Sequence, residues 1–330
     1  MEDIISKIKE AELVGRGGAG FPVYKKWELV KSFSGDKYII ANGAEGEPGV
    51  RKDEYILKNH SQEVISALEL ADKYLQAKEI FLYLNHKFKY LERKLKKQIR
   101  GNKKIKIIYK PKNAGYIAGE ESALLSILEN RHLEAGLRPP FPVESGYNSS
   151  PTLVNNVETL YNVSLVAKDQ YQNDRFYTIS GACFNPGVYK LKEDFSIKQV
   201  LELTKNLPAF DFFVQVGGDA SGEVLNQKQI NHEVSGCGAV TIYNLKKHEP
   251  IELLKFWVSF YVDNSCGKCT PCREGTYRLQ QMLSAKKMNW DHFLEILDNL
   301  SYSSFCALGS SLPIPIKSYL KNINPDLSLT

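Results

Sequence analysis

The pattern of apolar and polar positions begins with short apolar runs that alternate with helical patterns. In residues 1–168, the runs KYIIA, just before Asn42, and EIFLYLN (79–85) lie on either side of the helical pattern SQEVISALELADKYLQ (61–76). Runs of this kind indicate buried strands, and their alternation with helices predicts an α/β layer built on a largely parallel sheet.

The pattern changes twice further along the chain. Between residues 169 and 245, the short strands FYTISG, GVYKL and FVQVGG are punctuated by glycine and accompanied by one helical run, SIKQVLEL, which is typical of a small α+β module. From 246 to 330, apolar positions recur three and four residues apart, as in EPIELLKFWVSFYV, and predict a helical bundle. The sequence therefore predicts three domains: 1–168, 169–245 and 246–330.

Composition places the chain among ordinary globular proteins. Of its 330 residues, 43% are hydrophobic and 25% charged, and the beginning MEDIISKIKEAELVG has no apolar stretch of signal-peptide or membrane-span length. We expect a cytoplasmic protein, or one held peripherally at the inner face of a membrane as part of a complex, with no membrane insertion of its own. The net charge of +5 comes largely from residues 86–112, which we interpret as a solvated helix and strand, with no nucleic-acid partner. A docking patch or a nucleic-acid patch is the alternative interpretation.

Three cysteines lie three residues apart in SCGKCTPCREG: Cys266, Cys269 and Cys272. Within the same predicted bundle only Cys306 offers a fourth thiol. Three cysteines in C-x-x-C-x-x-C with one remote partner favour a [4Fe-4S] cluster, whereas structural zinc sites usually pair two cysteines with two more at a matching short spacing. Zinc and unliganded thiols remain the alternatives.

A glycine-rich stretch, VGRGGAGFP (14–22), is the first candidate for a ligand-binding loop. Its glycines allow a ligand to approach the backbone, and Arg16 adds a positive charge that suits a phosphate. The Rossmann spacing G-x-G-x-x-G is present in Gly15, Gly17 and Gly20, but the preceding SKIKEAEL looks helical. Taken alone, the stretch is more typical of an ordinary glycine-rich turn.

Three further motifs strengthen the prediction of a ligand site. NGAEGEPGVRKDE (42–54) is too acidic and too rich in glycine for a core, which favours a loop facing a ligand. In AGYIAGEESALL (114–125), Glu120 and Glu121 stand where a helix begins, and the plain interpretation is favourable charge at its N-terminus. In TLVNNVETL (152–160), Asn155 and Asn156 precede a helical run and are either caps or amide ligands.

Together these motifs resemble one family. GRGGAGFP, EGEPG, GEES, NNVETL and SCGKCTPCREGT, in this order, are similar to the flavin- and NADH-binding subunit of respiratory complex I and to its counterparts in NAD-reducing hydrogenases and formate dehydrogenases. The resemblance extends from Val14 to the region after Cys306. It implies a Rossmann-like FMN- and NADH-binding domain, a ubiquitin-like β-grasp module and a C-terminal four-helix bundle that holds the iron–sulfur cluster.

The resemblance also assigns site residues. It places FMN against Gly15, Arg16, Gly17, Gly18 and Lys26, with Asn42, Asn155, Asn156 and Thr159 completing the site. It places Phe21 against the adenine, and Glu47 and Glu121 facing NADH. An acid near the adenosine ribose repels a 2′-phosphate, so Glu121 favours NADH over NADPH. Further cofactor contacts are expected from Gly20, Glu45, Tyr116, Gly119, Glu120 and Val154. The cluster ligands are Cys266, Cys269, Cys272 and Cys306.

The function that the resemblance implies is NADH oxidation. NADH gives hydride to the flavin, and single electrons then pass to the cluster, so no catalytic acid, base or nucleophile is required from the protein. The family's electron acceptors are a thioredoxin-like [2Fe-2S] subunit and a multi-cluster iron–sulfur or hydrogenase- or formate-dehydrogenase-type subunit. We therefore expect a hetero-oligomer.

Several residues depart from the family pattern. Ala44 stands where the family has an aspartate near the flavin, Val23 and Tyr24 replace Thr-Gly, and Glu54 replaces an arginine. Asp263 and Asn264 stand where the family has His and Glu. Because the carboxylate at position 44 is missing, the alternative hypothesis is a subunit that kept its cluster and lost its flavin, acting as an electron relay or scaffold.

Overall fold

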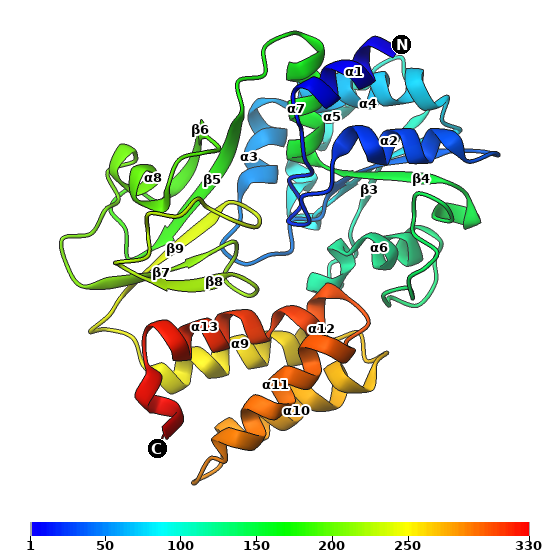
Figure 1. The fold of residues 1–330 in the computed structure, drawn as a ribbon. Coiled ribbons are helices and arrows are strands. Elements are labelled where there is room, and N and C mark those ends of the chain that lie inside the picture. The colour runs from blue at the N-terminus through cyan, green and yellow to red at the C-terminus, as the bar shows by residue number, and fades with distance from the viewer. Residues whose placement is uncertain (1, 330) are drawn as a thin grey trace. The chain divides into compact units, whose positions relative to one another are not determined.

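The computed structural model describes residues 2–329, which divide into two compact units (Figure 1). Unit 1 comprises residues up to 46, 51–114 and 118–176. Unit 2 comprises 47–50, 115–117 and 177 onward. The three predicted domain ranges stay predictions.

Unit 1 is built on a four-stranded parallel sheet with the strand order β3-β2-β1-β4. Its strands are β1 (Tyr38–Gly43), β2 (Glu79–Leu84), β3 (Ile105–Tyr109) and β4 (Thr152–Asn156). The parallel sheet confirms the α/β prediction for this part of the chain. β2 and β3 follow one another on one side of β1, whereas β4 lies on the other side of β1.

Helices cover both faces of this sheet. On one face, α4 (Ser61–Leu75) and α7 (Val157–Ala167) pack on each other and on β1. Toward the other face, Leu124 and Leu125 of α6 (Glu121–Leu128) pack with Tyr38, Ile40 and Phe81. Because both faces are buried, β1 and β2 are apolar at nearly every position, which is why the sequence shows these two strands as continuous runs.

The remaining elements of unit 1 connect these layers. The glycine-rich stretch lies between α1 (Glu2–Glu10) and α2 (Val23–Ser32), so a helix and not a strand precedes it, as its sequence indicates. The other elements, in chain order, are α3 (Lys52–Asn59), η1 (His86–Leu91), α5 (Glu92–Gln98), η2 (Tyr116–Gly119), which crosses the boundary between the units, and η3 (Tyr147–Ser149).

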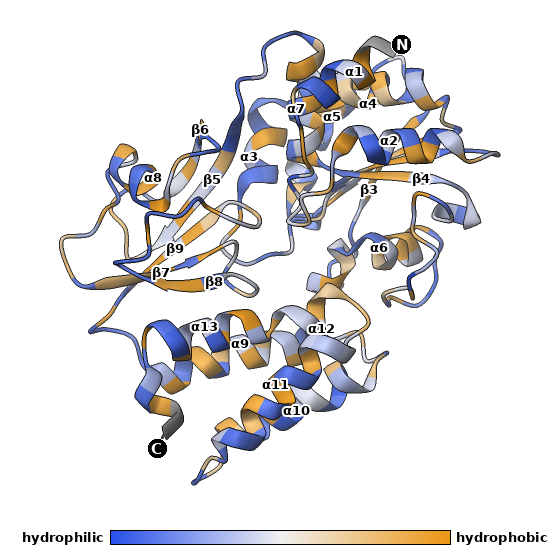
Figure 2. Cartoon of the chain, in the orientation of Figure 1, coloured by the Kyte–Doolittle hydropathy of each residue, from blue (hydrophilic) through white to orange (hydrophobic). Residues whose placement is uncertain are grey.

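Unit 2 contains a five-stranded mixed sheet with the order β6-β5-β9-β7-β8. Its strands are β5 (Asp174–Gly181), which begins in unit 1, β6 (Gly187–Lys192), β7 (Phe212–Val216), β8 (Glu223–Asn226) and β9 (Ala239–Asn244). Figure 2 shows apolar residues along β7 and β9, where Val214, Val216 and Ile242 pack with α8 (Ile197–Leu203) in one core.

The C-terminal helices of unit 2 follow this sheet. They are α9 (Pro250–Asn264), α10 (Thr270–Leu283), α11 (Trp290–Ser303), α12 (Ala307–Ser311), α13 (Pro313–Asn322) and η4 (Pro325–Leu329). The helix α13 runs along the edge strand β8, where Ser318 Oγ accepts the Val224 N–H at 2.8 Å and Asn322 Nδ2 donates to the Val224 carbonyl at 2.7 Å. These bonds satisfy backbone groups that an open edge would leave unpaired.

Candidate functional site

The predicted flavin residues of unit 1 gather at the carboxyl ends of β1 and β4. Asn42 lies near the end of β1 and is aligned with Asn156, the last residue of β4. These two strands are neighbours, and the strand order reverses between them. Open parallel sheets bind ligands at such a switch point, in the crevice beyond the carboxyl ends of the strands. The sheet thus offers a ligand site where the motifs predict one.

The glycine-rich loop closes on itself beside this edge. The Gly15 N–H donates to the Phe21 carbonyl at 2.9 Å, and Gly18 and Gly20 have φ angles of 106° and 64°, which side chains other than glycine rarely adopt. A Cβ added to Gly17 would lie 3.4 Å from the Asn156 Cβ. The loop therefore lies against the end of β4, and Gly18 and Gly20 give it a backbone conformation that other residues rarely adopt.

Arg16 and Thr159 connect this loop to α7. The Arg16 N–H donates to Thr159 Oγ1 at 2.8 Å, and the buried Arg16 guanidinium donates to Tyr171 Oη at 3.2 Å. Two residues predicted to contact FMN are thus in direct contact with each other. The guanidinium supplies a buried positive charge next to the loop, which is the chemistry that a phosphate requires.

The side-chain amides of the predicted site are engaged within the protein. Asn156 is the N-cap of α7, because its Oδ1 accepts the Glu158 N–H at 3.0 Å. Asn155 Oδ1 accepts Trp27 Nε1–H at 3.0 Å. Asn42 donates to the Gly119 carbonyl at 2.9 Å and accepts the Ala44 N–H at 3.1 Å. Of the two interpretations left open for Asn156, the cap is confirmed.

Two acids at the start of α6 have different partners. Glu120 is the N-cap, and its carboxylate accepts the N–H groups of Ser122 and Ala123, both at 2.9 Å. Glu121 instead pairs with Lys26 Nζ at 2.5 Å, and Lys26 also donates to the Val154 carbonyl at 2.9 Å. The interpretation of charge at a helix N-terminus therefore holds for Glu120.

Arg138 connects this acid pair to the loop that follows α6. Its guanidinium forms an ion pair with Glu120 and lies 3.9 Å from a Glu121 carboxylate oxygen. Lys26 and Arg138 together balance the two negative charges of this part of the site. The charge that a bound dinucleotide would meet here is thus smaller than the sequence motif GEES indicates.

A buried charge cluster next to the site was not predicted from the sequence. Lys52 Nζ lies 2.7 Å from Asp53 Oδ1, 3.2 Å from Glu158 Oε2 and 2.9 Å from Asn156 Oδ1, and all three charged side chains are at most 4% exposed. Asn156 Nδ2 donates to the other Asp53 oxygen at 2.7 Å. The cluster fixes the amide of Asn156 at the end of β4. The Lys-Asp pair and the acid of NNVETL were visible in the sequence, but nothing in their spacing showed that they meet.

Glu45 adds a further carboxyl to this neighbourhood. It accepts the N–H groups of Asp53, at 2.6 Å, and Glu54, at 3.2 Å, in the first turn of α3. Burial, and after it the negative charge of Asp53, raise the pKa of Glu45 to about 8, while Lys52 opposes the shift. Glu45 is therefore a proton-holding residue at neutral pH.

Glu47 and Tyr116, both predicted cofactor contacts, belong to unit 2. The buried Glu47 carboxylate accepts Tyr116 Oη–H at 2.7 Å, the Ala220 N–H at 2.9 Å and both the N–H and Oγ–H of Ser221 at 3.1 Å. Burial raises its pKa, and these hydrogen bonds lower it. A Cβ on Gly218 would lie 2.2 Å from Glu47 Oε1, so Gly218, the second glycine in FVQVGG, makes room for this carboxylate.

The four predicted cluster cysteines lie at the ends of helices in unit 2. Cys266 lies in the loop after α9, Cys269 is the N-cap of α10, Cys272 is in the first turn of α10 and Cys306 is the N-cap of α12. A Cβ on Gly309, in α12, would lie 3.1 Å from the Cys272 Cβ, so the two segments meet closely.

The pKa of Cys272 also indicates that the four thiols lie near one another. Burial raises the pKa of Cys272 to about 11, and the nearby thiols Cys269, Cys306 and Cys266 contribute to this rise. Among residues 2–329, no three or more His, Cys, Asp and Glu side chains are arranged so that they could hold a metal ion. Four thiols from helix ends are nevertheless the donor chemistry that iron–sulfur clusters use.

Two residues of unit 1 bear on the predicted adenine contact and on the departure from the family pattern at position 44. Phe21, the predicted adenine contact, is 43% exposed at the end of the glycine-rich loop. Ala44 is buried, and its Cβ would lie 3.3 Å from a Cβ on Gly119. It packs in the apolar cluster that contains Leu124 and Leu125. An aspartate at position 44 would have to bring its carboxylate through this packed region.

Comparison with known proteins gives the same assignment from two separate parts of the chain. Residues 8–165 match the family model described as the Nuo51 FMN-binding domain. Residues 252–329 match that of the NADH-ubiquinone oxidoreductase-F iron-sulfur binding region.

Several similar proteins extend over nearly the whole chain. The F subunit of the NADH-quinone oxidoreductase of Streptomyces coelicolor is 30% identical over 363 residues, which cover 97% of this chain and 81% of that protein. The alpha subunit of the NAD-reducing hydrogenase HoxS of Cupriavidus necator is also 30% identical, over 97% of this chain and 59% of that protein. The NADP-reducing hydrogenase subunit HndC of Solidesulfovibrio fructosivorans is 26% identical, over 96% of this chain and 73% of that protein.

Among solved structures, the NAD⁺-reducing [NiFe]-hydrogenase in its H₂-reduced state has a chain that matches with a TM-score of 0.91 and 27% identity. The match covers 99% of this chain and 62% of the hydrogenase chain, so the present chain spans about three fifths of that relative. None of the described helices has the length and apolar character that crossing a membrane requires.

Proposed function

This chain belongs to the family of the NADH-quinone oxidoreductase F subunit, and we propose that it oxidises NADH with FMN and passes the electrons through a [4Fe-4S] cluster to a partner subunit. The observation that carries the proposal is that one chain matches both an FMN-binding and an iron–sulfur-binding family model, in that order. When bound, FMN supplies the chemistry that joins a two-electron hydride transfer to single-electron steps.

The residues of this chain have positioning and binding roles in the proposed reaction. The glycine-rich loop and Arg16 would hold the flavin phosphate, because the loop offers close backbone approach and the guanidinium is buried beside it. Asn42 and Asn156 would shape the floor of the site, since their amides fix the ends of β1 and β4. Glu121 and Phe21 would contact NADH at the rim.

The thiols of Cys266, Cys269, Cys272 and Cys306 would hold the cluster. Helix α10 begins at Cys269, and the positive end of its dipole stabilises negative charge on thiolates and cluster sulfides. Only one short loop separates the first three cysteines, while the fourth comes from the separate segment that Gly309 brings against Cys272.

We also propose the finer architecture that the resemblance implies. A β-grasp assignment for residues 169–245 is supported by the mixed sheet β6-β5-β9-β7-β8 with α8 packed on it. A four-helix bundle in the tail is supported by the four longest C-terminal helices, α9, α10, α11 and α13. The acceptors would be a thioredoxin-like [2Fe-2S] subunit and a multi-cluster subunit, and relatives named as subunits support such a hetero-oligomer.

The test is a visible spectrum of the protein purified without oxygen, before and after addition of NADH, with FMN, iron and zinc quantified on the same sample. We expect about one FMN and four irons per chain and bleaching of the flavin band by NADH. Zinc in place of iron would overturn the cluster assignment.

The second candidate function is a flavin-free iron–sulfur relay, which the replacement of the family aspartate by Ala44 favours. It predicts four irons, no flavin and no response to NADH. Ala44→Asp separates the two functions. If flavin is absent from the natural chain and added FMN binds only to Ala44→Asp, the relay function is correct.

A further inference from the structure

The segment 86–112 has a charge of its own that the proposed function does not use. It contains 12 of the 43 Lys and Arg residues of the chain but only one of the 38 acidic residues, Glu92. The rest of the chain therefore has 31 basic and 37 acidic residues and is net negative. A concentration of one sign on one segment of a net-acidic chain attracts an anionic partner to that segment.

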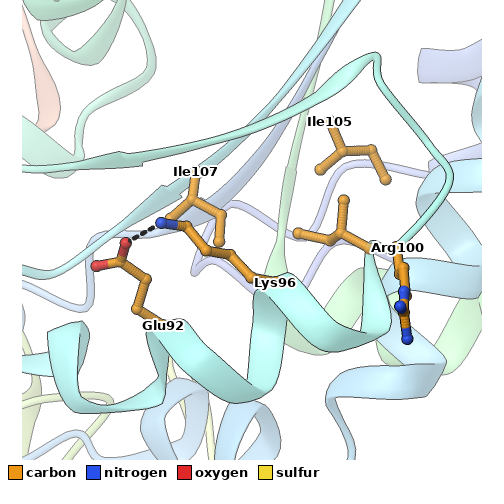
Figure 3. A pocket seen from close by; sticks show the side chains of 6 residues that line it. Glu92, Lys96, Arg100, Ile105 and Ile107 are labelled. Atoms are coloured by element: carbon orange, nitrogen blue, oxygen red, sulfur yellow. Dashed lines mark ion pairs between the residues drawn. The ribbon is translucent and has the colours of Figure 1, made fainter.

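This segment forms a groove within unit 1. The groove lies between α5 and β3 (Figure 3). Its volume is about 290 Å³. Glu92 and Lys96 stand four residues apart on α5 and share one face beside the strand, and Arg100, in the turn after the helix, also lines the groove. Ile105 and Ile107 line the strand side. The groove thus combines an apolar wall with a cationic rim.

The strand side of the groove is an open sheet edge. Among the strands that the structure describes, β3 pairs only with β2, at the end of the order β3-β2-β1-β4. The Ile80 N–H donates to the Lys104 carbonyl at 3.0 Å and the Lys110 N–H donates to the Leu84 carbonyl at 2.7 Å, so the even-numbered residues face β2. In a parallel ladder the backbone groups of the alternate residues, here Ile107 and Tyr109, then face outward.

We propose that this edge and groove bind an extended acidic segment of a partner protein, which adds a strand beside β3. An added strand satisfies the outward backbone groups, and its alternate side chains point to opposite faces. Apolar side chains on one face would enter the groove against Ile105 and Ile107. Carboxylates would meet the cations around it.

The charges around the groove are arranged for such a partner. Lys96, Lys104 and Lys106 already pair with Glu92, Asp72 and Glu79. Among the described side chains, no carboxylate forms an ion pair with Arg100, which lines the groove, or with three further cations of α5 and the turn after it, Arg93, Lys97 and Lys103. Carboxylates from a partner would supply the missing negative charge.

The chemistry of the groove favours a peptide over a phosphate-rich surface. A membrane surface or a nucleic-acid backbone would use the cations but would leave the isoleucine wall and the outward backbone groups without a role. An extended peptide uses all three features. The inference uses other residues than those of the flavin and cluster sites and does not depend on those sites being filled.

The experiment measures fluorescence anisotropy of a labelled eight-residue peptide of alternating glutamate and valine, titrated with the full purified chain. We expect binding that weakens by at least about tenfold when salt rises from about 50 mM to about 300 mM. A peptide of alternating lysine and valine is expected not to bind. Anionic phospholipid vesicles and a short DNA duplex serve as the competing probes.

Three variants locate the site. Arg100→Glu is expected to weaken binding about tenfold, because it places an acid at the cationic rim. Lys228→Glu, an exposed lysine in unit 2, makes the same change in net charge and is expected to alter the affinity less than about twofold. Ile107→Pro is expected to abolish binding, because it removes an outward N–H while no ladder bond to β2 is lost.

Several results would overturn the proposal. They are unchanged affinity in Ile107→Pro, an equal loss in Arg100→Glu and Lys228→Glu, or no binding of the acidic peptide to the natural chain. Binding of vesicles or DNA that is lost in Arg100→Glu, with no peptide binding, would assign the surface to phosphate groups instead. Circular dichroism of each variant confirms that the fold is retained.

Discussion

Replacing Lys52 by methionine tests whether the buried charge cluster holds the end of β4 in place. Methionine keeps an unbranched side chain that is one atom shorter and removes the only cation among Lys52, Asp53 and Glu158. Both acids are at most 4% exposed, so water cannot replace the lost ammonium group. Breaking a buried ion pair from one side typically costs about 3–5 kcal/mol of unfolding free energy, because an uncompensated charge stays buried.

The loss should depend on pH in a defined direction. Burial raises the pKa of Asp53, and Lys52 is the largest influence that lowers it. Without Lys52 this pKa rises further, so the folded variant holds a proton that the unfolded chain releases. Its stability therefore falls as pH increases, and the loss relative to the natural chain should be larger at about pH 8 than at about pH 5.

Urea unfolding followed by circular dichroism measures both effects. Lys104→Met is the matched control, because Lys104 makes contacts of 2.9 and 3.0 Å to Asp72 but is about half exposed. Exposed pairs contribute about 0.2–1 kcal/mol, so the control should lose no more than that. A loss below about 1 kcal/mol in Lys52→Met at both pH values would refute the reasoning.

Three further predictions concern the other groups of the two candidate sites. Because the pKa of Glu45 is raised to about 8, this residue should lower the free energy of unfolding by up to about 1.4 kcal/mol per pH unit between about pH 5 and pH 8. Glu45→Gln should flatten this slope. Equal slopes for the natural chain and the variant, measured by urea unfolding across that range, would contradict the assignment. Cys306→Ser should lower the iron content of anaerobically purified protein, whereas Cys183→Ser, outside the four thiols, should not; equal iron in both variants would exclude Cys306 as a ligand. Arg138→Ala should leave the negative charge of Glu121 less well neutralised. In ferricyanide reduction, the KM for NADPH relative to the KM for NADH should then rise by about fivefold. An unchanged ratio of the two KM values would show that Arg138 has no part in dinucleotide selection.

The sequence predicts the strands of unit 1 that are apolar on both faces. It does not predict β4. β1 and β2 appear as uninterrupted apolar runs because helices cover both sides of the sheet. β4 has the sequence TLVNN, which is short and ends in two asparagines, so its periodicity does not identify a strand. It is a strand because it pairs with β1 over Tyr38–Asn42, a tertiary interaction that local sequence does not contain.

The same limit applies to the side chains of the site. The sequence placed Asn156 before a helix, where a cap and a ligand look alike, and only the hydrogen bond to the Glu158 N–H distinguishes them. Asn264 stands where the family has a glutamate. It accepts the Tyr116 N–H at 2.6 Å and donates to the Phe260 carbonyl at 2.7 Å. Its role is structural in unit 2, and no motif spacing could have shown a contact across 148 residues.

The position of the proposed flavin site follows from strand order more than from any single motif. Glycine-rich loops occur in many turns, and here a helix precedes the loop, so the motif alone has little weight. The order β3-β2-β1-β4 places the reversal of the sheet between β1 and β4. Asn42 and Asn156 stand at that reversal, and Gly17 lies against Asn156. A ligand bound there would meet motifs that lie far apart in the sequence, which explains why each is weak alone and informative with the others.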